Sequence, residues 1–213
     1  SMLLMLVLGS TSVWGQSPVE ITTDTNGNGI IDDNEKKFYL IQTNAFPSFF
    51  IAPQDKNNNN NWTITTNNIL GEYMLWYFLD AGTDNGTQYY YIVNNSTGKY
   101  IYNHNGTYDG TNGGDGDKRQ IKLIDLSTLS DNDKEKCKFK LVVNNNGGTT
   151  DCYNINVKAS QTYYCLNKQS GSQANDNPIR LTNDDYNHYI NDSNSKWKFI
   201  PFNGTYTWPA TTF

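Results

Sequence analysis

Aromatic and β-branched residues recur along the chain in short runs that end at polar turn residues. The clearest case is segment 88–104, where two such runs, 89–93 and 99–102, flank the polar stretch NNSTG. Alternating runs of this kind predict half-buried β-strands, and a connection rich in Asn, Ser and Gly predicts a hairpin turn. This segment therefore predicts a two-stranded hairpin.

The same pattern occurs twice more, at 38–52 and 153–167, so that the three hairpins open at Tyr39, Tyr89 and Tyr153. Each hairpin is followed by a third short run and by a closing run with a central aromatic residue. The third runs are 62–65, 121–124 and 179–182, and the closing runs are 75–78, 138–141 and 196–199. Four strands repeated three times predict an all-β domain with internal threefold repetition.

Two groups of motifs carry a resemblance to a known family. The middle hairpin contains IVNNSTGKYI at 92–101, and the closing runs contain MLW at 74–76, CKF at 137–139 and SKW at 195–197. These segments resemble the ricin B-type lectins, whose β-trefoil fold has three four-stranded units around a pseudo-threefold axis. The closing Gln-x-Trp motif of that family keeps its aromatic residue here but lacks its glutamine in all three units. The resemblance implies a β-trefoil over residues 37–202.

The segments outside this domain have different characters. Residues 2–15 read MLLMLVLGSTSVWG, an apolar run too short to cross a bilayer that is followed by small residues. This pattern is typical of a secretory signal, so we expect 1–15 to be signal-like and the protein to be exported to the periplasm, surface or surroundings of a bacterial cell. We expect an N-terminal extension at 16–36 and a tail or linker at 203–213.

The extension contains a calcium-loop motif. Residues 24–35 read DTNGNGIIDDNE and match D-x-[DN]-x-[DN]-G-x₅-E at every fixed position. The predicted Ca²⁺ ligands are the side chains of Asp24, Asn26, Asn28, Asp32 and Glu35 and the backbone carbonyl of Ile30. Neither flank has a helical pattern, so we expect a loop between extended segments in which calcium rigidifies the extension. The alternative is a polar turn without a metal.

Charge and reactive residues narrow the possible functions. The 16 basic and 21 acidic residues are scattered, and a net charge of −5 argues against nucleic acid as a partner. Three cysteines, Cys137, Cys152 and Cys165, allow at most one internal disulfide and leave at least one thiol free or paired between chains. With two histidines and no catalytic motif, we expect no enzymatic activity.

The family resemblance also implies sugar sites, each with an acid after the second strand, an aromatic platform near the third strand and an amide beyond it. A ring face packs on the apolar face of a pyranose, while carboxylates and amides bind its hydroxyls. The candidates are Asp55 and Trp62 in unit one, Asn103, Tyr108 and Asp109 in unit two, and Asn167, Asp185, Tyr186 and Asn187 in unit three. We therefore expect a secreted module that binds polysaccharides or glycoprotein glycans, with weak sites that gain from multivalency.

The alternative is a β-trefoil that docks on or inhibits another protein and has vestigial sugar positions. Units two and three lack a carboxylate directly after the second strand, which favours this alternative. Two polar insertions at 108–117 and 183–194, expected to be irregular, could carry such recognition because surface loops commonly do. The one helical pattern, at 126–136, has Ser130 or Asp131 as its N-cap.

Overall fold

The computed structural model describes residues 17–55, 62–103, 121–158, 164–168, 175, 177–181 and 186–204. The strands are β1 (Phe38–Thr43), β2 (Phe50–Asp55), β3 (Trp62–Asn67), β4 (Trp76–Asp84), β5 (Thr87–Asn94), β6 (Tyr100–Asn103), β7 (Ile121–Ile124), β8 (Lys138–Val143), β9 (Tyr153–Val157), β10 (Leu166–Lys168), β11 (Asn177–Leu181) and β12 (Trp197–Phe202). The helices are α1 (Asp131–Lys134) and α2 (Tyr186–Asn191), and the 3₁₀ turns are η2 (Glu72–Met74), η4 (Leu126–Thr128), η5 (Glu135–Cys137), η6 (Asn146–Gly148) and η7 (Ser193–Ser195). The signal-like segment and candidates Tyr108, Asp109 and Asp185 lie outside the described residues.

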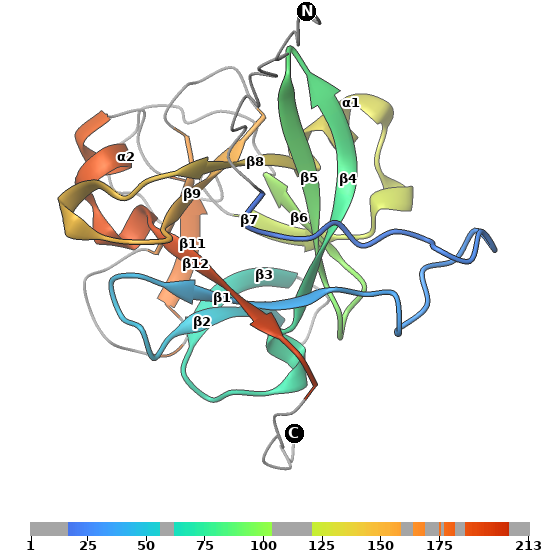
Figure 1. The fold of residues 1–213 in the computed structure, drawn as a ribbon, viewed down its shortest axis with the longest axis horizontal. Coiled ribbons are helices and arrows are strands. Elements are labelled where there is room, and N and C mark those ends of the chain that lie inside the picture. Colours follow the sequence, from blue (N-terminus) through green and yellow to red (C-terminus); the bar gives the residue numbers. More distant parts are fainter. Residues whose placement is uncertain are drawn as a thin grey trace, which may run out of the picture.

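Six antiparallel strands close a barrel in the order β1, β12, β9, β8, β5, β4 and back to β1. The other six strands form the hairpins β2–β3, β6–β7 and β10–β11, which meet where β3 pairs with both β7 and β11. The β4–β5 hairpin extends beyond the rest of the barrel (Figure 1). A barrel with three hairpins is a β-trefoil, so the fold predicted from the sequence is confirmed.

The three units repeat the same register. In each, a tyrosine of the first strand lies opposite the aromatic residue of a closing strand: the pairs are Tyr39–Trp76, Tyr90–Phe139 and Tyr153–Trp197. The predicted opening of the middle unit at Tyr89 was wrong by one residue, because residues 89–91 are all tyrosine and fit the alternation equally well.

Backbone hydrogen bonds tie each unit to the next. In every unit an N–H beyond the first strand donates to a carbonyl at the start of a closing strand, at 2.9 Å: Asn95 to Leu75, Lys158 to Lys138 and Asn44 to Lys196. The last of these bonds joins the third unit back to the first. The threefold ring is therefore closed by the backbone itself, independently of side-chain identity.

The closing aromatic residues fill the centre of the barrel. Trp76 and Trp197 are fully buried, and their indole N–H groups donate to the carbonyls of Ile51 at 3.0 Å and Leu166 at 2.9 Å. A buried indole N–H needs such an acceptor. Phe139 takes the corresponding place in the middle unit without a donor. The aromatic plug is thus retained in all three units, as expected.

The residues at the family's glutamine position are Met74, Cys137 and Ser195, and all three are fully buried. Cys137, Cys152 and Cys165 are free thiols, so the internal bridge allowed by the sequence does not form. Burial raises the pKa of Cys137 to about 12, which makes it a packing residue and not a reactive thiolate.

Residues 17–23, which we term the N-terminal strap, cross one end of the barrel (dark blue in Figure 1). Val19 lies in the core, and the Thr22 N–H donates to the Phe78 carbonyl at 2.8 Å. The Glu20 N–H donates to the Tyr39 hydroxyl at 2.8 Å. The strap therefore belongs to the packed domain and connects it to the loop at 24–35.

The helical elements lie between the strands. Ser130 caps α1, where its hydroxyl accepts a hydrogen bond from the Asp133 N–H at 3.2 Å, as the sequence predicted. The insertion at 183–194 was predicted to be irregular, which was wrong, because it contains α2 and η7.

No helix within the described ranges combines the length and apolar character needed to cross a membrane.

Candidate functional site

One polar cluster is built in unit three from β10 and η7. The Asn167 side-chain N–H₂ donates to Asp192 Oδ2 at 2.9 Å and to Ser195 Oγ at 2.8 Å. The other oxygen of Asp192 accepts from the backbone N–H of Asn194 at 2.9 Å and from its side-chain N–H₂ at 3.0 Å. Asp192 therefore caps η7 and fixes both amides. We term Asn167, Asp192, Asn194 and Ser195 the unit-three cluster.

Two amide oxygens of this cluster have unused acceptor capacity. The Asn194 side-chain oxygen is buried and has no hydrogen-bond partner within the described parts of the chain. The Asn167 side-chain oxygen likewise accepts no hydrogen bond from any residue that the structure describes. Arg180 lies directly opposite Asn167 across the β10–β11 pair and brings a positive charge to the same hairpin. The cluster thus combines an unpaired amide oxygen on Asn167 with a carboxylate, and Arg180 lies on the neighbouring strand.

Buried asparagines hold α2 against η7. The Asn154 side-chain N–H₂ donates to the carbonyls of Tyr189, at 3.1 Å, and Ser195, at 2.8 Å. Its side-chain oxygen accepts from Asn144 at 2.8 Å, and Asn144 also reaches the Tyr189 carbonyl at 3.1 Å. Because unpaired buried polar groups are costly, this network specifies one position for α2.

The corresponding location in unit one is apolar. Phe50, Ala52 and Met74 form a small separate hydrophobic cluster, against which Leu40 and Tyr73 pack. Ala52 corresponds to Asn167, because each follows the carbonyl that accepts the indole N–H of its unit. Unit one therefore fills with hydrocarbon the location where unit three holds amides.

The other predicted sugar residues are dispersed. Asp55 and Trp62 lie opposite each other at the end of the β2–β3 pair. Asn103 ends β6 and is only 2% exposed, so its side chain lies in the interior. Tyr186 and Asn187 begin α2, the helix held by the asparagine network.

Four residues near Asn167 were missed by the sequence reasoning: Arg180, Asp192, Asn194 and Ser195. A signal was present, since the NDSNS sequence at 191–195 contains an Asp two residues before an Asn, the arrangement that caps a short turn. It was assigned to an irregular insertion. Recognising the cap would have placed these side chains next to the closing strand.

The predicted calcium loop is compact. The two carboxylate oxygens of Asp24 accept from the N–H groups of Gly27 and Gly29, both at 2.7 Å. The side-chain N–H₂ groups of Asn26 and Asn28 both donate to Asp32 Oδ2, at 2.9 and 3.3 Å. These two amides therefore contact Asp32 through their nitrogen atoms, while their oxygen atoms accept from the backbone N–H groups of Asn28 and Ile30.

Glu35 closes the loop by joining its two ends. Glu35 is 7% exposed. Its Oε1 accepts from the Thr25 backbone N–H at 2.7 Å, the Thr25 hydroxyl at 2.5 Å and the Asn26 N–H at 3.1 Å. Its Oε2 accepts from the Asp32 N–H at 2.9 Å. These hydrogen bonds, led by the Thr25 hydroxyl, lower the pKa of Glu35 to about 2. A carboxylate so engaged must turn before it can bind a metal bidentately.

The ligand types and order in the loop fit Ca²⁺, which prefers oxygen ligands from Asp, Asn, Glu and backbone carbonyls. Gly29 has a φ of +82°, the left-handed conformation that the sharp turn of this motif requires. No group of three or more His, Cys, Asp or Glu side chains positioned to hold a metal occurs within the described ranges. A metal in this loop would therefore depend on the asparagine and carbonyl oxygens.

Comparisons with known proteins bear on the fold. No family model and no curated protein matches the chain. Among solved structures, a designed threefold symmetric protein, ThreeFoil, is 15% identical with a TM-score of 0.56, covering 76% of this chain and 97% of that chain. The chain is a β-trefoil.

Two further neighbours are sugar-binding proteins by name. A Polyporus squamosus lectin, bound to the human-type influenza-binding epitope Neu5Acα2-6Galβ1-4GlcNAc, is 14% identical with a TM-score of 0.54, covering 77% of this chain and 48% of that chain. The Rhizoctonia solani agglutinin is 16% identical with a TM-score of 0.52, covering 78% and 96%. Likeness at these identities shows the fold alone.

Proposed function

We propose that this protein is an exported carbohydrate-binding module whose site is the unit-three cluster and which catalyses no reaction. The observation that carries the proposal is the amide oxygen of Asn167, which Asp192 and Ser195 hold in place and which is unpaired within the described residues. Sugar hydroxyls can donate a hydrogen bond to such an oxygen. The lectins among its structural neighbours support this class of ligand.

The proposed ligands are polysaccharides or glycoprotein glycans. Half-buried amides and one carboxylate form a shallow polar site, which suits the edge of one or two sugar residues. Tyr186, on α2, is the candidate aromatic platform, because the asparagine network holds this helix next to η7. Affinity at one such site is expected to be weak, and several copies on a surface strengthen it.

A glycan-array screen of the exported chain tests this proposal. Asn167→Ala and Asp192→Ala should each weaken the selected glycan about tenfold or more, since each removes or releases a hydrogen-bonding group. Glu72→Ala is the matched control, because Glu72 is an exposed acid in the 3₁₀ turn of unit one, equivalent to η7. A blank array, or equal loss in the control, would reject the sugar site and favour the protein-docking alternative.

We also propose that the loop at 24–35 binds Ca²⁺ and thereby stiffens the N-terminal extension. Its support is the complete motif and the closeness of the Asn26, Asn28 and Asp32 side chains, whose amides would turn to present oxygen to the metal. In this proposal Glu35 exchanges its backbone hydrogen bonds for the metal. Titration calorimetry should show one site that Asp24→Ala abolishes, whereas Asp33→Asn, at a position outside the ligand set, retains it. Absence of binding to the unmodified chain at millimolar calcium would contradict the proposal.

A further inference from the structure

The strap leaves one corner of the barrel end uncovered. Three equivalent tyrosines, Tyr39, Tyr90 and Tyr153, surround this end. The Glu20 N–H donates to the Tyr39 hydroxyl at 2.8 Å, and the Ser17 and Tyr90 hydroxyls share a hydrogen bond of 2.9 Å. The Tyr153 hydroxyl has no hydrogen bond to any residue that the structure describes. Threefold symmetry thus identifies a corner that none of the described residues fills.

A pocket of about 570 Å³ occupies this corner. Its apolar wall comes from Pro18 and Ile21 of the strap and from Leu141 and Val143 of β8. Val143 continues the inward alternation of Phe139 and Leu141 but is 60% exposed, because nothing described covers it. An inward-facing valine left in water is unfavourable, and an apolar ligand would bury it.

The polar residues of the pocket favour an anion. Lys140 is the one charged residue in its lining, and no described residue forms an ion pair with it. Strand alternation places the Lys140 side chain on the opposite face of β8 from Leu141 and Val143, so Lys140 meets a ligand's negative charge only at the edge of the pocket. Tyr153 lies opposite Val143 in the β8–β9 pair, and its hydroxyl is a second donor.

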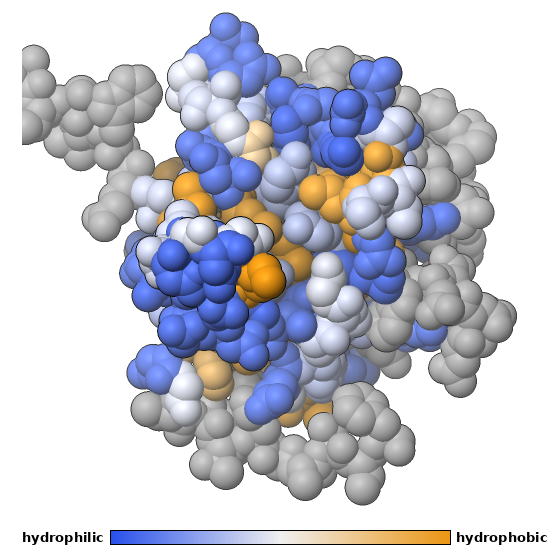
Figure 2. All heavy atoms as spheres, turned by 90° about the vertical axis from the view of Figure 1, so that its right-hand side faces the viewer, coloured by the Kyte–Doolittle hydropathy of each residue, from blue (hydrophilic) through white to orange (hydrophobic). Residues whose placement is uncertain are grey.

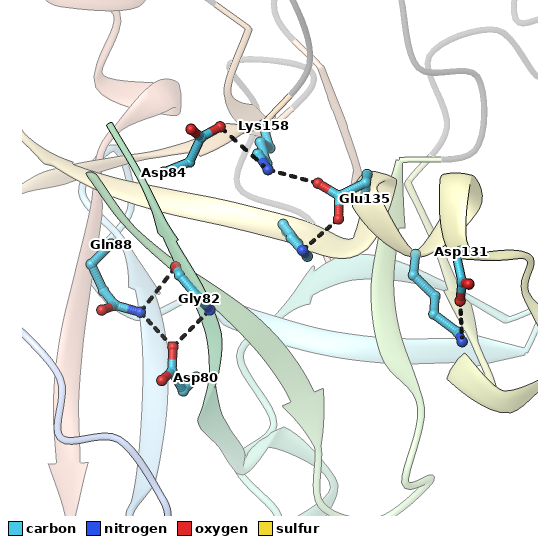
Figure 3. Close-up of polar contacts among 9 residues, drawn as sticks. Asp80, Gly82, Asp84, Gln88, Asp131, Glu135 and Lys158 are labelled. Carbon is cyan, nitrogen blue, oxygen red and sulfur yellow. Dashed lines mark hydrogen bonds and ion pairs between the residues drawn. The ribbon is translucent and has the colours of Figure 1, made fainter. Parts of the chain in front are cut away.

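The opposite wall is fixed before any ligand arrives. Gln88, which also lines the pocket, donates from its side-chain N–H₂ to Asp80 Oδ1 at 2.7 Å and to the Gly82 carbonyl at 3.4 Å (Figure 3). The β4–β5 hairpin, to which Gln88 belongs, is also held by an ion pair: Lys158 Nζ lies 3.5 Å from Asp84 Oδ2 (Figure 3). A wall held by these contacts needs little ordering on binding.

We propose that this pocket binds a small amphiphilic carboxylate. The apolar part of the ligand lies against Ile21, Leu141 and Val143, and its carboxylate pairs with Lys140 at the rim. The volume falls within the range of small-molecule sites, about 300–1,000 Å³. The site lies at the strap and β8, whereas the unit-three cluster lies on β10 and η7, so this inference does not depend on sugar binding.

The test uses two probes, 8-anilinonaphthalene-1-sulfonate by fluorescence and dodecanoate by calorimetry and displacement of that dye. One dye should bind per chain, and dodecanoate should displace it. Val143→Asp should weaken both probes about tenfold or more, because it places a charge of the ligand's own sign in the apolar wall. Lys140→Gln should weaken dodecanoate about three- to tenfold, as expected for one partly exposed ion pair.

Two matched controls separate this site from general surface effects. Ile69→Asp changes another exposed apolar residue, 54% exposed and outside the pocket, and Lys37→Gln removes a lysine elsewhere. Both should bind the probes as the unmodified chain does, and circular dichroism should show all four variants folded. Absence of one-to-one dye binding, or equal loss in a variant and its control, would overturn the proposal, and a blank glycan array would leave it standing.

Discussion

Units one and three place different chemistry on the same backbone. Three equivalent positions, on the first strand, second strand and 3₁₀ turn, hold Leu40, Ala52 and Met74 in unit one but Asn154, Asn167 and Ser195 in unit three. The first set packs as hydrocarbon, whereas the second forms hydrogen bonds that fix a turn and a helix. One location is thus core in one unit and a polar site in another.

This difference shows which features specify the fold. Both units share the buried tryptophan, its bond to a strand carbonyl and the backbone link to the neighbouring unit. The three variable positions contribute to none of these. A β-trefoil therefore tolerates either chemistry there, provided that each set is complete in itself. Placing a residue of the apolar set in unit three, or of the polar set in unit one, should therefore lower the free energy of unfolding.

The largest effect is expected from giving unit three a residue of unit one. Asn154→Leu removes the donors to the carbonyls of Tyr189 and Ser195, and leaves the Asn144 amide with one partner fewer. Unpaired buried groups of this kind cost about 3 kcal/mol of unfolding free energy in total. Urea denaturation measures it, with exposed Asn34→Leu as a control expected to change stability by less than about 0.5 kcal/mol. Equal effects would contradict the role of the network.

The reverse exchange should cost somewhat less. Ala52→Asn inserts an amide among Phe50, Met74 and Leu40, where no described side chain of that cluster can satisfy it. We expect a loss of about 2 kcal/mol in the same denaturation experiment. A stable Ala52→Asn variant would show that unit one can be converted to a polar site by one substitution, and the contrast between the units would be weaker than proposed.

A smaller loss of stability is expected at the buried aromatic position of the closing strand, which holds an aromatic residue in all three units. Trp197→Phe makes unit three resemble the middle unit, in which Phe139 already serves as the plug. The lost indole N–H leaves the Leu166 carbonyl without this donor, and we expect about 1–2 kcal/mol of destabilisation by thermal or urea unfolding. A loss above that of Asn154→Leu would show that the plug, and not the polar network, dominates unit three.

The smallest effect is a local pH dependence confined to the extension that leads into unit one. The folded pKa of Glu35 is about 2 against an ordinary 4.5, so its carboxylate stabilises the loop fully above pH 4.5 and loses this contribution as the pH falls towards 2. Amide hydrogen exchange of Thr25 and Asp32 should therefore accelerate over this window, after correction for intrinsic rates. Glu35→Gln should remove the dependence, whereas unchanged protection at pH 2 would contradict it.

Much of the fold could be predicted because its signal is local and repeated. Alternating aromatic and β-branched residues located the strands, and the closing motifs located the plugs. The opening tyrosine of the middle unit was placed at Tyr89, one residue too early. Residues 89–91 are all tyrosine, so the sequence does not show which of them faces inward. Register there is decided by the pairing of Tyr90 with Phe139, which joins residues far apart in the sequence.

Less of the candidate site could be predicted, because its residues are defined by contacts across the chain. Asn167 was identified from its place after a second strand, and the structure adds Asp192 and Ser195 as its partners. Asn154 resembles any surface asparagine in the sequence, and only its partners show that it is buried. Figure 2 shows another face, mostly hydrophilic with separate hydrophobic patches, on which composition alone would select no site.

The pairing of β1 with β12 has a consequence for synthesis of the protein. Phe38 pairs with Phe202, so the strand made first in the domain must wait for the strand made last. All residues of the domain up to β12 must therefore be synthesised before the barrel can close, and β1 spends that interval without this partner strand. Contacts of such long sequence separation make folding slow. Until β12 is available, the edge of β1 is open to pairing with other strands, which is a risk of aggregation.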